Sequence, residues 1–85
     1  MKGEYFLYHG ITLSNIPRRK HEAEEYLKKA IEIDPLKTDY YIELGNLYLK
    51  SGLKAKALAL YREALDQNPA SVKIHEAIKV AEASK

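Results

Sequence analysis

The fold is decided by residues 41–69, which read YIELGNLYLKSGLKAKALALYREALDQNP. Residues three and four positions apart share one face of a helix. Two such stripes of apolar and small residues are present: Tyr41, Leu44, Gly45 and Tyr48, then Ala57, Leu60, Tyr61, Ala64 and Leu65. Gly52 lies between the stripes, where a helix end favours a residue that tolerates positive φ, and Pro69 ends the second stripe because it disfavours helical backbone before it. The stretch predicts a helix near 39–51, a turn at Gly52 and a helix near 54–67.

Small residues recur where these two helices would meet. Gly45, Ala57 and Ala64 allow two helix axes to approach closely, with aromatic rings filling the space beside the contact, so we expect Gly45 to lie against the second helix. The order aromatic-x2-Leu-Gly-x2-Tyr, Ala-x3-aromatic, Pro resembles the tetratricopeptide repeat, a helix-turn-helix unit of about 34 residues. The resemblance implies an all-α fold, a right-handed superhelix of antiparallel helix pairs.

An earlier repeat is found when this pattern is moved back by about 34 residues. The proline and both alanines of the second half recur as Pro35, Ala30 and Ala23, and Leu27 takes the place of the aromatic residue. These matches predict a helix over about 20–34.

The first helix of that earlier repeat is predicted over 4–15. The aromatic residue and the glycine of the repeat correspond here to Phe6 and Gly10, and Leu13 takes the place of the tyrosine. His9 replaces the leucine, so we expect a partly buried histidine with a structural role. The turn that follows is one residue longer than its counterpart, and its Asn-x-Pro-Arg-Arg sequence followed by Glu-Ala-Glu is similar to repeats found C-terminal to J-domains in some bacterial proteins.

A fifth helix is predicted near 70–83, with Ser71 as its N-cap. An apolar stripe at helical spacing comprises Ile74, Ala77, Ile78 and Ala81, and the residues expected to face water are Lys73, Glu76, Lys79 and Glu82. A solenoid needs such a polar surface at its end. We therefore expect one domain over 1–85, with repeat 1 at about 4–37, repeat 2 at about 38–71 and a capping helix at about 70–83.

Composition narrows the class of protein. The 85 residues are 46% hydrophobic, contain no cysteine and carry a net charge of +2, so a packed core is expected, while disulfides and thiolate metal sites are excluded. No signal peptide or stretch of about 20 apolar residues is found. We expect a cytoplasmic protein without a membrane partner.

Catalytic patterns are absent from the sequence. His21 and Glu22 begin like a zinc-protease helix, but Glu25 stands where the second histidine belongs. The four glycines are scattered and form no phosphate loop. We expect no enzyme activity, no cofactor and no metal.

The resemblance implies protein–protein interaction, with a peptide or helix of the partner held in a concave groove lined by the first helix of each repeat. The residues that correspond to this groove are Leu7, Tyr8, Ile11, Ile42, Glu43, Asn46, Lys73, Glu76 and Val80. Some family members clamp the acidic tail of heat-shock chaperones with lysine, asparagine and arginine at these places. Lys73 fits that requirement but Glu43 has the wrong charge, so a chaperone tail is not expected.

A basic rim is predicted along the turns within the repeats, with Arg18, Arg19, Lys20 and Lys54. It is either a solvated surface or a site for an acidic or phosphorylated partner, and we do not expect nucleic acid there.

The first predicted helix, over 4–15, carries apolar residues on more than one side. The chain is therefore either the end of a longer repeat protein or a unit whose exposed side meets a partner or a second copy, and a structural, self-associating piece is the alternative function.

Overall fold

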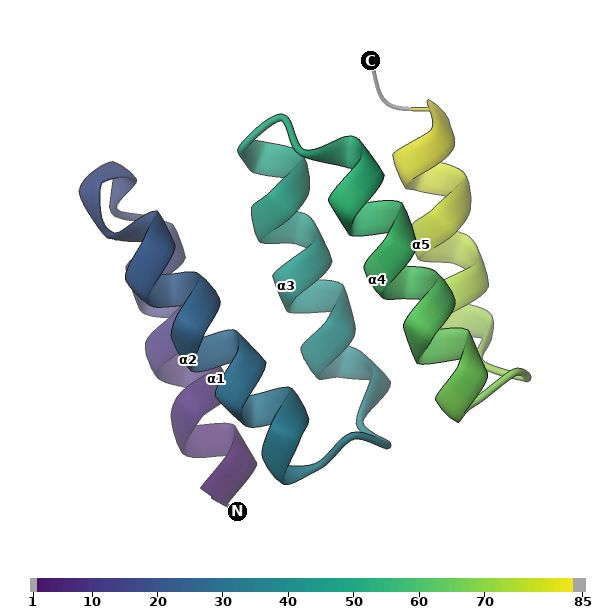
Figure 1. Cartoon of the computed structure of the whole chain (residues 1–85), viewed down its shortest axis with the longest axis horizontal. Coiled ribbons are helices and arrows are strands. Elements are labelled where there is room, and N and C mark those ends of the chain that lie inside the picture. Colours follow the sequence, from purple (N-terminus) through teal and green to yellow (C-terminus); the bar gives the residue numbers. More distant parts are fainter. Residues whose placement is uncertain (1, 84–85) are drawn as a thin grey trace.

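The computed structural model describes residues 2–83 and shows an all-α chain (Figure 1). Within these residues the elements are α1 (Lys2–Ser14), the 3-10 turn η1 (Pro17–Arg19), α2 (Lys20–Ile33), α3 (Thr38–Lys50), α4 (Lys54–Gln67) and α5 (Val72–Ala83). The helices form antiparallel pairs that stack in chain order from α1 to α5. The all-α fold predicted from the sequence is confirmed.

The pair α3 and α4 packs through the two predicted stripes. Tyr41, Leu44, Gly45 and Tyr48 are all buried on α3, as are Ala57, Tyr61 and Ala64 on α4. A Cβ atom at Gly45 would collide with the ring and hydroxyl of Tyr61. Glycine is required at position 45 because the Tyr61 ring occupies the space that any other side chain would need.

The turn between α3 and α4 is closed by backbone hydrogen bonds. Gly52 adopts a φ of 77°, the left-handed conformation that glycine reaches without steric cost. The amide of Leu53 donates to the carbonyl of Tyr48 at 2.8 Å, and that of Gly52 donates to the carbonyl of Leu49 at 3.1 Å. These two bonds are the Schellman arrangement that satisfies carbonyls at a helix end.

The turn between α1 and α2 is built differently. Pro17 opens the 3-10 turn η1, and the amide of Arg19 donates to the carbonyl of Ile16 at 2.8 Å. None of the non-glycine residues described here has a positive φ. Proline's fixed φ, rather than a glycine, reverses the chain, which accounts for the longer turn noted in the sequence.

The expectation for His9 was wrong. Its side chain is exposed and stacks on the ring of Tyr26, with the ring centroids 5.4 Å apart. Leu44 holds the equivalent place in α3 and is buried, because α3 lies between α2 and α4. The pair α1 and α2 stands at the end of the stack (Figure 1), and among the described residues the only α-helices that α1 contacts are α2 and α3.

Helix α5 closes the other end as predicted. Ser71 caps it, since its Oγ accepts a hydrogen bond from the amide of Ile74 at 3.3 Å. Ile74 and Ala81 are buried, and the four residues expected to face water are exposed: Lys73, Glu76, Lys79 and Glu82. No helix among the described residues is long and apolar enough to cross a membrane.

Candidate protein-binding groove

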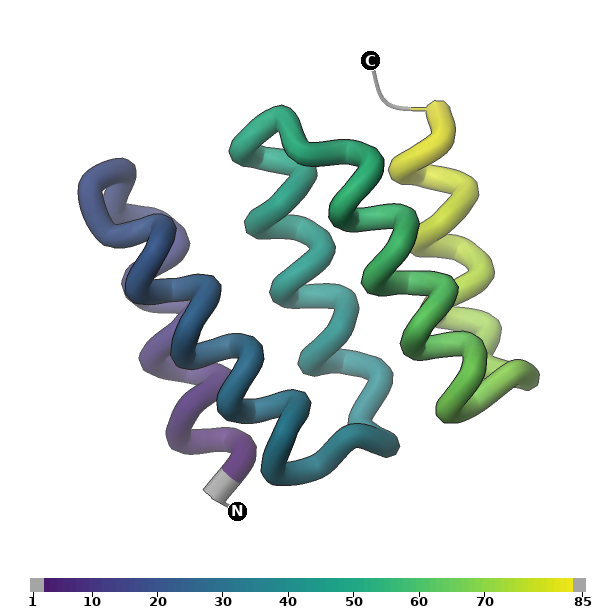
Figure 2. Tube along the Cα trace, viewed as in Figure 1, coloured from purple at the N-terminus to yellow at the C-terminus, as the bar shows by residue number. Residues whose placement is uncertain are grey.

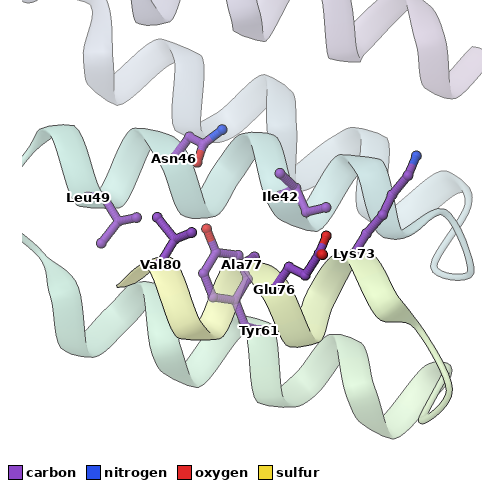
Figure 3. A pocket seen from close by; sticks show the side chains of 8 residues that line it. All are labelled: Ile42, Asn46, Leu49, Tyr61, Lys73, Glu76, Ala77 and Val80. Carbon is purple, nitrogen blue, oxygen red and sulfur yellow. The ribbon is translucent and has the colours of Figure 1, made fainter. Parts of the chain in front are cut away.

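A depression of about 260 Å³ opens between α3 and α5, above α4 (Figure 3). It is lined by Ile42, Asn46 and Leu49 from α3, Tyr61 from α4, and Lys73, Glu76, Ala77 and Val80 from α5. The α3 residues recur at helical spacing, and so do those of α5. The depression therefore follows from two helix faces that diverge above the Tyr61 ring.

The walls of the groove are apolar in the middle and charged at one end. Ile42, Leu49 and Ala77 are half-buried, whereas Val80 is 66% exposed. At the end near the start of α5, Lys73 Nζ lies 3.1 Å from Oδ1 of Asp39 on α3. This exposed ion pair joins the two walls and leaves the apolar middle open to solvent.

Tyr61 forms the floor of the groove. Its side chain is 1% exposed, and the hydroxyl points into the space between α3 and α5 (Figure 3). Burial raises the pKa of this phenol, and the carboxylate of Glu43 raises it further. The hydroxyl is therefore neutral at physiological pH and can donate a hydrogen bond at the base of the groove.

The structure brings together five of the nine groove residues named from the sequence: Ile42, Asn46, Lys73, Glu76 and Val80. Glu43 is half-buried beside the groove without lining it. The three from α1 do not line it either: Leu7 belongs to the core, Ile11 is half-buried, and Tyr8 is exposed.

Sequence reasoning missed three lining residues, Leu49, Ala77 and Tyr61. Leu49 could have been found, since it lies seven residues after Ile42 and three after Asn46 and so shares their helix face. Ala77 and Tyr61 were assigned to packing stripes. Both do pack, and one edge of each also reaches the groove.

The two turns that carry the predicted basic rim, between α1 and α2 and between α3 and α4, lie along the same edge of the stack (Figure 2). Arg18 and Arg19 are in η1, and Lys20 and Lys54 begin α2 and α4. Arg19 pairs with Glu22 at 3.2 Å, and the ammonium of Lys54 donates to the backbone carbonyl of Glu82 at 3.2 Å. Acidic and carbonyl groups thus accompany the basic side chains, and the edge is not uniformly cationic.

A polar cluster near this rim joins the two repeats. The hydroxyl of Tyr48 on α3 donates to Glu24 Oε2 on α2 at 2.8 Å, and the ammonium groups of Lys28 and Lys56 lie 3.2 and 3.8 Å from the same oxygen. The Glu24 side chain is 16% exposed. Burial alone would raise the pKa of Glu24, but the hydrogen bonds from Tyr48 and Lys28, together with the positive charges of Lys28 and Lys56, outweigh this effect and lower it.

No group of three or more potential metal ligands is found in the described part of the chain. A search of curated proteins finds no match to this sequence. A family model described as the tetratricopeptide repeat matches residues 21–79, which are 59 of the 85 residues. That range contains all of α3 and α4, most of α2 and much of α5. The chain belongs to the tetratricopeptide repeat family.

Proposed function

We propose that the groove between α3 and α5 binds a peptide or helix of a partner protein. Tetratricopeptide repeats are in general protein–protein interaction modules, and this chain adds a groove of suitable shape. Its volume of about 260 Å³ is below that of most small-molecule sites, which span roughly 300–1,000 Å³. One or two apolar side chains of a partner fit such a space better than a cofactor does.

The observation that carries this proposal is the exposed apolar wall of α5 above a buried hydroxyl. Val80 is 66% exposed although it lies across the groove from Leu49, at the end away from Lys73 (Figure 3). An apolar side chain placed there would bury surface on both walls, at about 25 cal/mol per Å² of apolar area. The Tyr61 hydroxyl would then donate a hydrogen bond to a backbone carbonyl of the ligand, and this bond would fix the orientation of the ligand in the groove.

The test uses a matched pair of valines on α5. Val80 and Val72 are 66% and 69% exposed, but Val80 lines the groove and Val72 does not. Peptides selected from a random display library against the parent chain serve as the ligand. We expect Val80→Glu to weaken their binding at least about tenfold, because a carboxylate would be desolvated against an apolar side chain.

Val72→Glu is the control and should bind these peptides like the parent. Both variants should melt like the parent because both valines are exposed. Equal affinity of the two variants, or peptide-induced NMR shifts confined to helices other than α3, α4 and α5, would overturn the proposed site.

A further inference from the structure

A second exposed surface lies at the opposite end of the stack from α5. There the outer sides of α1 and α2 enclose a depression of about 280 Å³ lined by Phe6, Glu25, Tyr26 and Lys29. The rings of Phe6 and Tyr26 have centroids 6.0 Å apart. We call this surface the N-terminal face; it comprises Phe6, His9, Glu25, Tyr26, Lys29 and Ile33.

Apolar groups on this face are left uncovered by the described part of the chain. Phe6 and Tyr26 are only half-buried, and Ile33, seven residues after Tyr26 on the same side of α2, is 44% exposed. In the second repeat the corresponding side of α3 is covered by α2. The α1 part of the N-terminal face therefore has the character of an inter-repeat surface without its neighbour. Its α2 part corresponds to a side of α4 that is exposed in the second repeat, at Ala59 and Glu63.

The two ends of the stack do not match each other. On α5, the exposed Lys79 lies 34 residues after Gly45, at the place where a following helix would have to pack closely. Exposed His75 and Glu82 flank it. Burying these polar side chains against an aromatic surface would cost free energy, so head-to-tail stacking of copies is disfavoured.

The charges on the N-terminal face allow this face to pack against the same face of a second copy of the chain. Glu25 and Lys29 are exposed one helical turn apart on α2, at the edge of the aromatic depression, where Lys29 Nζ lies 5.9 Å from the centre of the Phe6 ring. No ion pair within 4 Å joins either of them to another described residue. In a two-fold contact, residue i of one copy meets residue j of the other, and j meets i. Glu25 of each copy would then face Lys29 of the other, while the rings pack at the centre.

We propose that two copies of this chain associate through the N-terminal face across a two-fold axis. The dimer would stack four repeats, which exceeds the three or so that such arrays need for stability. It would carry the polar α5 at both outer ends, where a solenoid requires a solvated cap. The contact closes at two copies because no second N-terminal face remains free.

Sedimentation equilibrium of the 85-residue chain tests the proposal. The weight-average mass should rise from 9.7 kDa towards twice that value as concentration increases. Lys29→Glu and Glu25→Lys should each weaken the dimer at least about tenfold, because each places like charges opposite one another twice. An equimolar mixture of the two variants should dimerise like the parent, since each carries the charges that the other lacks.

The matched control is Lys79→Glu, an exposed lysine reversed on the opposite end, which should leave dimerisation unchanged. Circular dichroism should show the same helix content for all variants. A parent chain that stays monomeric at every concentration would overturn the proposal and assign the face to another segment or partner. So would association that continues beyond two copies, or a Lys29→Glu variant that dimerises like the parent.

Discussion

The two repeats use the same helix pair in different surroundings. Leu44 in α3 is 1% exposed, whereas His9, its counterpart in α1, is exposed. Gly45 accommodates the Tyr61 ring, and Gly10 accommodates Leu27 in the same way, since a Cβ at Gly10 would come within 2.6 Å of that side chain. Packing within each pair is therefore preserved, and the difference arises on the side where one pair has a neighbour and the other does not.

The largest effect expected from this comparison concerns Leu44 and His9. Leu44→Ala should lower the free energy of unfolding by about 2–5 kcal/mol, because it removes buried methyl groups and leaves a cavity. His9→Ala should change it by less than about 0.5 kcal/mol, as is usual for an exposed side chain. Urea denaturation followed by circular dichroism at low protein concentration measures both values.

If Leu44→Ala is unfolded without denaturant, Leu44→Met keeps the test open, because it preserves volume and should cost less than about 1.5 kcal/mol. Equal losses for Leu44→Ala and His9→Ala would show that the two repeats are packed alike, contrary to the structure.

An intermediate effect is expected where the two repeats are joined. Tyr48→Phe removes the hydrogen bond to the Glu24 carboxylate and should cost about 1.5 kcal/mol, the lower end for a bond to a charged group, since Lys28 and Lys56 remain beside it. Tyr61→Phe is the control and should cost less, because no hydrogen bond of its hydroxyl to another described residue is found. Thermal melts at pH 7 give both values.

The same variant has a pH signature. The pKa of Glu24 is lowered in the folded chain from its ordinary value of 4.5, so its stabilising contribution is present above that pH and is lost as pH falls through the folded-state pKa. Tyr48→Phe should therefore lose less stability on acidification than the parent does. Parallel acid denaturation curves for the two proteins would contradict the role assigned to this contact.

The smallest effect is expected at the basic rim. Arg19→Glu places an anion at the start of α2, where the helix dipole favours it, but it also replaces the Arg19–Glu22 ion pair by two like charges. These opposing terms are both small at exposed positions. The free energy of unfolding should therefore change by no more than about 0.5 kcal/mol. The corresponding shift in melting temperature should be small, and it should shrink in high salt.

For the basic rim, a clear fall in melting temperature on Arg19→Glu would mean that Arg19 contributes more than a surface ion pair. If a partner peptide is in hand, a slower association rate for this variant would indicate that the rim attracts the partner. An unchanged rate would indicate a solvated surface.

Much of the groove could be read from helical spacing once the repeat was recognised. Ile42 and Asn46 are four residues apart on α3, and Glu76 and Val80 are four apart on α5, so each pair had to share a face. Leu7 could not be assigned in this way. It holds the position in α1 that Ile42 holds in α3, and whether that position lines a groove or fills the core depends on how far the next helix diverges.

The sequence by itself determined the helices, the turn at Gly52 and the packing within each pair, because these depend on residues close in the chain and on the size of Gly45, Ala57 and Ala64. Tertiary structure alone decided what each outer surface meets. It left His9 exposed although its place in the repeat predicts burial, linked Glu24 to Tyr48 across 24 residues, and opened the groove above Tyr61. The physical reason is that burial is set by the neighbours a helix has in space, which a local repeat pattern does not specify.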